Sequence, residues 1–113
     1  MTNYTELNAK LQGRNKNSRK VGNHTHAVRN ADNSIGIRLH GTQVVVFLED
    51  GRVVLNSGRW RTVATKARMN EFIPKPWKVF QKDFDWFLHN YENGDVLAFN
   101  DGMDVPVAVA VQS

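Results

Sequence analysis

Residues 34–55, SIGIRLHGTQVVVFLEDGRVVL, decide the predicted fold. Ile35, Ile37 and Leu39 alternate with small or polar residues, a pattern typical of a strand with one buried face. The continuously apolar run 44–48 indicates a central strand covered on both faces. Asp50-Gly51 separates two strand-like runs and predicts a tight hairpin turn. This stretch therefore predicts consecutive antiparallel strands.

The segment that follows predicts one central helix over about residues 62–73. Residues 56–61 have the composition of a loop, and Thr62 is a favourable N-cap residue. Residues 63–72 contain neither glycine nor proline, whereas Pro74 and Pro76 are expected to end the helix.

Further strand-like runs lie on both sides of this region, at residues 24–29, 77–81, 84–89 and 95–99, with Asn93-Gly94 as a second hairpin signal. A short N-terminal helix is also expected, because Leu7 and Leu11 are four residues apart. We therefore predict the α+β class: a mainly antiparallel sheet or open barrel of about six to seven short strands, with the helix covering one face or filling the barrel.

The length of 113 residues suits a single domain. We expect residues 1–22 to form a basic arm, or a short helix plus loop, and residues 23–113 to form the globular domain. The absence of cysteine excludes disulfides and thiolate metal sites. There is neither a membrane-length apolar run nor a signal-peptide pattern, so we expect a cytoplasmic protein that does not associate with membranes.

The formal net charge of +4 is distributed unevenly along the chain. Between Glu6 and Asp32 there are no acidic residues, whereas after Lys82 there is no lysine or arginine. A basic segment of this kind predicts a polyanion partner. Alternatively, the two ends neutralise each other within one molecule or between two copies, so a homodimer is also an expectation.

The loop before the predicted helix is a candidate anion site, because a helix N-terminus offers free N–H groups and a positive dipole. In this interpretation the arginines bind phosphate, Trp60 stacks on a base, and the lysine and arginine of the next turn extend the positive field. In the alternative interpretation Gly58 forms the bend, Trp60 anchors the core and the arginines are solvated. Together with the basic arm, the predicted nucleic-acid-binding residues are Arg14, Lys16, Arg19, Lys20, Ser57, Gly58, Arg59, Trp60, Arg61, Lys66 and Arg68.

The histidines give a weaker signal. His24 and His26 are two residues apart on a predicted strand, so they would face the same way, and His40 could join them. No carboxylate is close in sequence to complete a ligand set. We therefore predict no metal site, no cofactor and no catalytic residue.

Residues 55–70, LNSGRWRTVATKARMN, resemble a stretch of the form LNSGGWRTVTTKxRxN in a family of small, uncharacterised tailed-bacteriophage proteins. Upstream, Arg19-Lys20 and the runs 24–29 and 35–47 are also similar, so the resemblance covers roughly residues 14–73. This sequence departs from the family pattern at Arg59, where a second glycine is usual, and at His24 and His26, which replace Asn and Tyr. The resemblance implies the cytoplasm of an infected bacterium and implies no activity.

Three functions are compatible with these observations. The first is a phage accessory protein that binds nucleic acid through phosphates, which requires a contiguous basic face. The second is an interaction module that inhibits a host defence or transcription protein, which requires an exposed apolar or acidic patch over about residues 84–104. The third is a small nuclease or nucleotide-processing enzyme, which requires His24, His26 and a carboxylate to meet in a cleft.

Overall fold

The computed structural model describes residues 4–12, 17–22, 24–58 and 62–106. Within these ranges the chain forms nine strands in two sheets and two helices, which confirms the predicted α+β class without a closed barrel. More strands form than the expected six to seven, because the short strands β1 and β9 lack an alternating apolar pattern. The elements are α1 (Tyr4–Lys10), β1 (Ser18–Gly22), β2 (Thr25–Arg29), β3 (Ile35–Leu39), β4 (Thr42–Phe47), β5 (Val53–Leu55), α2 (Val63–Phe72), β6 (Trp77–Lys82), β7 (Asp85–Asn90), β8 (Val96–Ala98) and β9 (Met103–Asp104).

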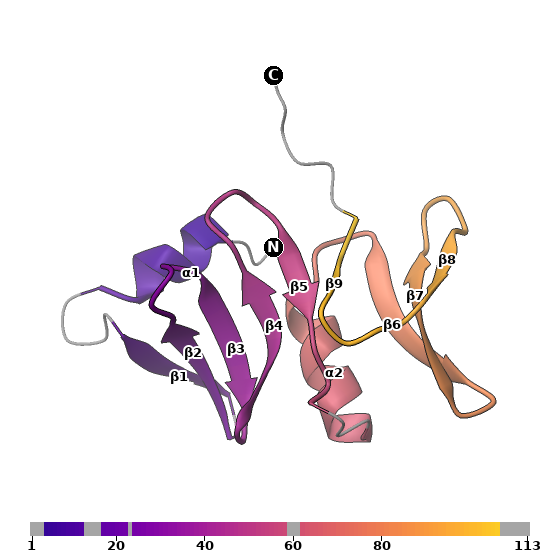
Figure 1. Cartoon of the computed structure of the whole chain (residues 1–113), viewed down its shortest axis with the longest axis horizontal. Helices are drawn as coiled ribbons and strands as arrows, with labels where there is room; N and C mark the ends of the chain where they lie inside the picture. The colour runs from indigo at the N-terminus through magenta and orange to yellow at the C-terminus, as the bar shows by residue number, and fades with distance from the viewer. Residues whose placement is uncertain (1–3, 13–16, 23, 59–61, 107–113) are drawn as a thin grey trace.

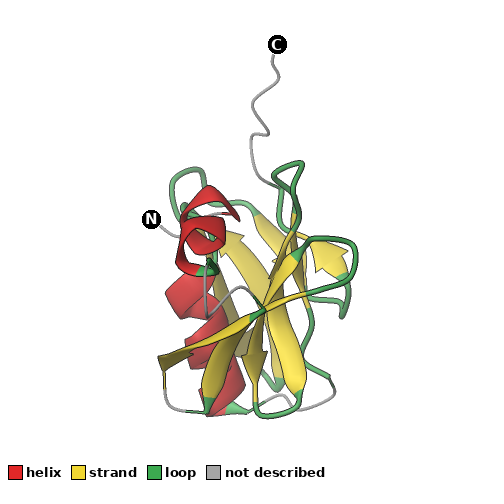
Figure 2. Ribbon diagram, turned by 90° about the vertical axis from the view of Figure 1, so that its left-hand side faces the viewer, coloured by secondary structure: helices red, strands yellow, loops and turns green. Residues whose placement is uncertain are grey.

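Two antiparallel sheets share one core. The large sheet has the order β1-β2-β3-β4-β5-β9, and the small sheet has the order β6-β7-β8. The two sheets lie side by side (Figure 1), and α2 packs against β4 of the large sheet and β6 of the small sheet. Both helices lie on the same side of the strands (Figure 2). Neither helix of the described ranges has the length and apolar character needed to cross a membrane.

A bulge explains the apolar run in β4. The register passes from Ile37↔Val45 to Arg38↔Gln43, so Val44 is an extra residue on its strand. Val44 and Val45 are therefore both buried, whereas Val46 remains partly exposed. The expectation of a strand covered on both faces was wrong, because the bulge turns two consecutive valines towards the same core.

The helix α2 matches its prediction closely. Thr62 is the N-cap, and its Oγ1 accepts a hydrogen bond of 3.2 Å from the backbone N–H of Thr65. At the other end the Ile73 N–H donates to the Met69 carbonyl at 2.8 Å, directly before Pro74. The buried side chains of α2 are Thr65, Met69 and Phe72.

The N-terminal region contains the expected short helix and an unexpected strand. Leu7 and Leu11 are buried in the core. Ser18 to Lys20, which were expected in a loop or arm, belong to β1, where Ser18 pairs with Val28. An edge strand with polar, exposed residues lacks the apolar alternation that predicts strands, so its pairing could not be recognised from the sequence.

Candidate nucleic-acid interface

The register of the large sheet separates a buried face from an outer face. One row of opposed residues runs across four neighbouring strands: Ala27 opposes Ile37, Ile37 opposes Val45, and Val45 opposes Leu55. Each of these four residues is 0% exposed. Neighbouring residues along a strand point to the opposite face, and directly opposed residues share a face. The outer face therefore begins one residue away from each of these positions.

Three basic side chains form a row on this outer face. Lys20 of β1 opposes His26 of β2, and His26 opposes Arg38 of β3. We call these three residues the basic row. Lys20 is exposed, and the other two are partly exposed. Since adjacent strands lie about 4.8 Å apart, the row spans about 10 Å across three strands.

No described carboxylate neutralises the basic row. The ion pairs within the described residues join Arg52 to Asp50 at 3.0 Å, Arg52 to Asp104 at 3.8 Å and Arg68 to Glu71 at 3.0 Å. None of them includes a member of the row, so its positive field faces solvent.

The carboxylate of the turn between β2 and β3, Asp32, lies at the other end of these strands. The Ser34 side chain and then its backbone N–H donate hydrogen bonds of 2.6 and 2.9 Å to Asp32 Oδ1, and these bonds hold the pKa of Asp32 below its ordinary value of 3.8. Asp32 is therefore charged at neutral pH. Its negative charge lies in the turn at the end of the strands away from the basic row.

A pair of side-chain amides fixes the surface beside the row. Gln43 opposes Arg38, and its amide exchanges hydrogen bonds of 2.9 and 2.8 Å with the amide of Asn30. The Gln43 side chain lies over Gly36, where an added Cβ would come within 2.5 Å of the Gln43 Cδ. Because Gly36 has no side chain, the Gln43 side chain has room to lie over it, next to Arg38.

The loop residues Ser57 and Gly58 have structural roles in the described chain. Ser57 is 0% exposed, and its N–H and Oγ both donate to Asp101 Oδ1, at 2.9 and 2.8 Å. Gly58 has a φ of +60° and accepts no side chain readily, because an added Cβ would lie 2.7 Å from Thr42 Cγ2. The Ser57 hydroxyl was a candidate phosphate contact, but it already donates its hydrogen bond to the Asp101 carboxylate.

The side chains of Lys66 and Arg68 also have protein hydrogen-bond partners. The Arg68 Nε donates to Thr25 Oγ1 at 2.9 Å, which ties α2 to β2, and its Nη1 donates to Glu71 Oε1 at 3.0 Å. The Lys66 Nζ lies 3.5 Å from Gln81 Oε1. Five further predicted residues, Arg14, Lys16, Arg59, Trp60 and Arg61, lie outside the described residues, and their roles stay predictions.

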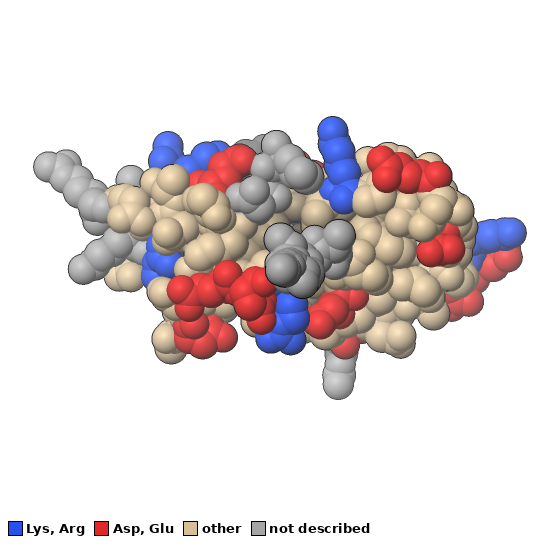
Figure 3. Space-filling view, turned by 90° about the horizontal axis from the view of Figure 1, so that it is seen from above, with Lys and Arg blue, Asp and Glu red and all other residues tan. Residues whose placement is uncertain are grey.

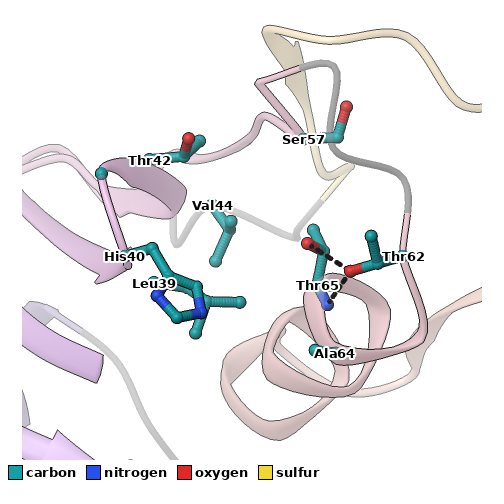
Figure 4. A pocket seen from close by; sticks show the side chains of 9 residues that line it. Leu39, His40, Thr42, Val44, Ser57, Thr62, Ala64 and Thr65 are labelled. Atoms are coloured by element: carbon teal, nitrogen blue, oxygen red, sulfur yellow. Dashed lines mark hydrogen bonds between the residues drawn. The ribbon is translucent and has the colours of Figure 1, made fainter. Parts of the chain in front are cut away.

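A cavity of about 590 Å³ lies at the N-terminus of α2. Side chains from the end of β3 and the start of β4 face the first turn of the helix across it (Figure 4). The Thr62 and Thr65 hydroxyls lie 3.1 Å apart, and the Ser57 hydroxyl is bonded to Asp101. These three hydroxyls already have protein partners. It is lined by Leu39, His40, Gly41, Thr42, Val44, Ser57, Thr62, Ala64 and Thr65.

The histidines do not assemble a described metal or catalytic centre. The rings of His24 and His40 stack with centroids 4.9 Å apart at the ends of β2 and β3. In the part of the chain that the structure describes, no three histidine, aspartate or glutamate side chains are grouped to hold a metal ion. The nuclease or nucleotide-processing alternative stays a prediction, because the described residues hold no such group of side chains.

The predicted nucleic-acid site lacked two residues of the basic row: Arg38 was not among its residues, and His26 was considered only as a metal ligand or as an acid–base group of an enzyme. A signal for both was present. The alternation of residues 35–39 places Arg38 opposite the face of Ile35, Ile37 and Leu39. What the sequence could not give is the register that brings Lys20, His26 and Arg38 into line.

The family model for the Kyanoviridae Gp96 protein matches residues 4–106. The match covers most of the chain and confirms the predicted kind of family, that of a small tailed-phage protein. Neither a curated protein nor a solved structure matches the chain.

Proposed function

The chain belongs to the Kyanoviridae Gp96 protein family, and from this premise we propose that it binds nucleic acid through backbone phosphates. The observation that carries the proposal is the basic row of Lys20, His26 and Arg38 on the outer face of the large sheet, where no described ion pair involves its members. The proposed setting is the cytoplasm of the infected bacterium.

The chemistry of the row suits phosphate. Lysine supplies a compact charge, and the planar guanidinium of arginine can make two parallel hydrogen bonds to one phosphate. The residues that flank the row on the outer face, Val28, Gly36 and Val46, are small and uncharged. The outer-face carboxylate in line with these residues, Asp104 opposite Val54, lies across the sheet on β9. The formal net charge of +4 adds long-range attraction.

The contacts are with the backbone, so the binding is expected to depend weakly on sequence and strongly on salt. Each phosphate contact lowers the logarithm of the binding constant by about 0.7 to 0.9 for each tenfold rise in salt concentration. Binding of labelled single- and double-stranded oligonucleotides should be measured by fluorescence anisotropy over a salt series. Lys20→Gln with Arg38→Gln is expected to lower the magnitude of the slope by about 1.5 and to weaken binding at low salt.

The matched control is Lys78→Gln with Lys82→Gln, which removes the same formal charge from exposed positions of the small sheet. This variant is expected to retain most of the salt slope. Native protein that fails to bind at low salt would contradict the proposal, and so would two variants with the same loss of slope. In the second case the net charge, and not the basic row, would determine binding.

A further inference from the structure

The small sheet also has an outer face, and aromatic side chains cover its centre. Phe80 of β6 opposes Phe87 of β7, which in turn opposes Ala98 of β8. The rings of Phe80 and Phe87 stack with centroids 5.3 Å apart, and His89 meets Phe80 edge-on at 5.9 Å. We call Phe80, Phe87 and His89 the aromatic patch. All three are partly exposed, whereas Val79 and Leu88, one residue along, are buried on the other face.

Further exposed apolar side chains lie on the same sheet and in its turns. Phe84, in the turn between β6 and β7, is 93% exposed and has a φ of +70°, an unusual conformation for a bulky residue. On β8, Val96 is 51% exposed and Leu97 is 38% exposed. Of the exposed large apolar side chains in the described residues, only Val63 lies outside residues 84–97. Apolar surface concentrated in this way marks an interaction site.

The strand β8 has a free edge. Among the described strands it pairs with β7 alone. The Asn90 N–H donates to the Asp95 carbonyl at 2.8 Å and the Phe99 N–H to the Trp86 carbonyl at 3.0 Å, on either side of the opposed pair Leu88 and Leu97.

In an antiparallel ladder the hydrogen-bonded positions alternate. The backbone groups of Leu97 therefore point towards β7, and those of Val96 point away from the sheet. No lysine or proline in β8 protects this edge, although such residues commonly block edge strands.

The charge beside β8 is negative, whereas the exposed Lys78 and Lys82 lie on β6, at the opposite edge of the small sheet. After Lys82 the chain contains only acidic charged residues, and three of them, Asp85, Glu92 and Asp95, belong to β7 or to the connection into β8. Figure 3, seen from above, shows carboxylates on the half of the molecule that holds β6 to β8, together with Lys or Arg side chains at its far edge. Next to β8, Glu92 and Asp95 would repel phosphates and attract a basic polypeptide.

We propose that β8 accepts an extended, basic segment of a partner protein as a fourth strand of the small sheet. Backbone groups of Val96 pair with the incoming strand, whose apolar side chains pack beside Val96 and extend the apolar outer face of the sheet. Lysine or arginine side chains of the partner face Glu92 and Asp95. This surface is separate from the basic row, so one molecule can hold nucleic acid and a protein partner together.

The probe is a synthetic peptide of alternating valine and lysine, about ten residues long. It is titrated into the full chain, in parallel with a counterpart in which glutamate replaces lysine. The lysine peptide is expected to bind and the glutamate peptide is not. Val96→Pro removes an outward N–H while leaving the ladder to β7 in place, and it is expected to weaken peptide binding about tenfold. Val96→Thr keeps both the N–H and the branched shape and should bind within about twofold of the native chain.

A second variant keeps the test decisive should Val96→Pro fail to fold. Glu92→Lys with Asp95→Lys reverses the charge beside β8 without changing the strand, and should abolish binding of the lysine peptide. Native affinity in a folded Val96→Pro chain would overturn strand addition, and tight binding of the glutamate peptide would overturn the charge argument. Displacement of the peptide by an oligonucleotide would assign the patch to nucleic acid. Sedimentation that shows a dimer lost in Val96→Pro would assign the edge to a second copy of the chain, and both of these outcomes overturn the proposal.

Discussion

Reversing both strong charges of the basic row, Lys20→Glu with Arg38→Glu, is expected to lower the affinity for an oligonucleotide about 100-fold at low salt. Each substitution removes an attraction and adds a repulsion, and near a protein surface each change is worth about tenfold or more. Because neither side chain takes part in a described ion pair, the fold should lose little stability. Fluorescence anisotropy gives the affinity, and thermal unfolding gives the stability.

The control for this variant is Lys78→Glu with Lys82→Glu, which changes the net charge equally on the small sheet. Its affinity is expected to fall less than tenfold, through the weakened long-range field alone. The two variants together separate the local row from the overall charge. Equal losses in both would mean that Lys20 and Arg38 make no specific contact with phosphate.

Replacing Gly58 with alanine is expected to destabilise the fold by about 2–4 kcal/mol. One part of this loss comes from φ, which is +60° at Gly58 and unfavourable for any residue with a Cβ. The other part comes from Thr42, whose Cγ2 and Oγ1 would both lie 2.7 Å from the new Cβ. Urea unfolding measures the change. Folded protein of this variant should still bind the oligonucleotide, because the role of Gly58 is structural.

Two comparisons separate these contributions. Gly94 has a φ of +84° with no atom within 4 Å of an added Cβ, so Gly94→Ala should cost only about 1–2 kcal/mol. In a chain that already carries Thr42→Ala, the added cost of Gly58→Ala should fall towards the same value, because the two close atoms have gone. A cost of Gly58→Ala no larger than that of Gly94→Ala would show that Thr42 does not confine the loop.

Local patterns predicted the parts of the fold that depend on neighbouring residues. The alternation of Ile35, Ile37 and Leu39, the Asp50-Gly51 turn and the Thr62 cap each act over a few residues, and each prediction was confirmed. The division into two sheets depends on contacts between distant residues. β5 pairs with β9, which places Leu55 opposite Met103, and no local pattern in the two short strands indicates that partnership.

The candidate site shows the same limit. Lys20 could be proposed from the sequence because it lies in a basic segment, but its alignment with Arg38 depends on the register of three strands. The role of Arg68 was equally hidden, because its partner Thr25 is distant in sequence and brought close only by the packing of α2. Charge alone could not distinguish an arginine that links two elements from one that faces solvent.

The most direct test of the central proposal is to map where an oligonucleotide binds. Amide chemical shifts of the isotope-labelled full chain are followed by nuclear magnetic resonance during a titration at low salt. The predicted result is that the largest shift changes occur at Lys20, His26 and Arg38, while Phe87 and the rest of the small sheet change little. Changes confined to the small sheet, or to the first turn of α2, would contradict the assignment of the basic row as the nucleic-acid interface.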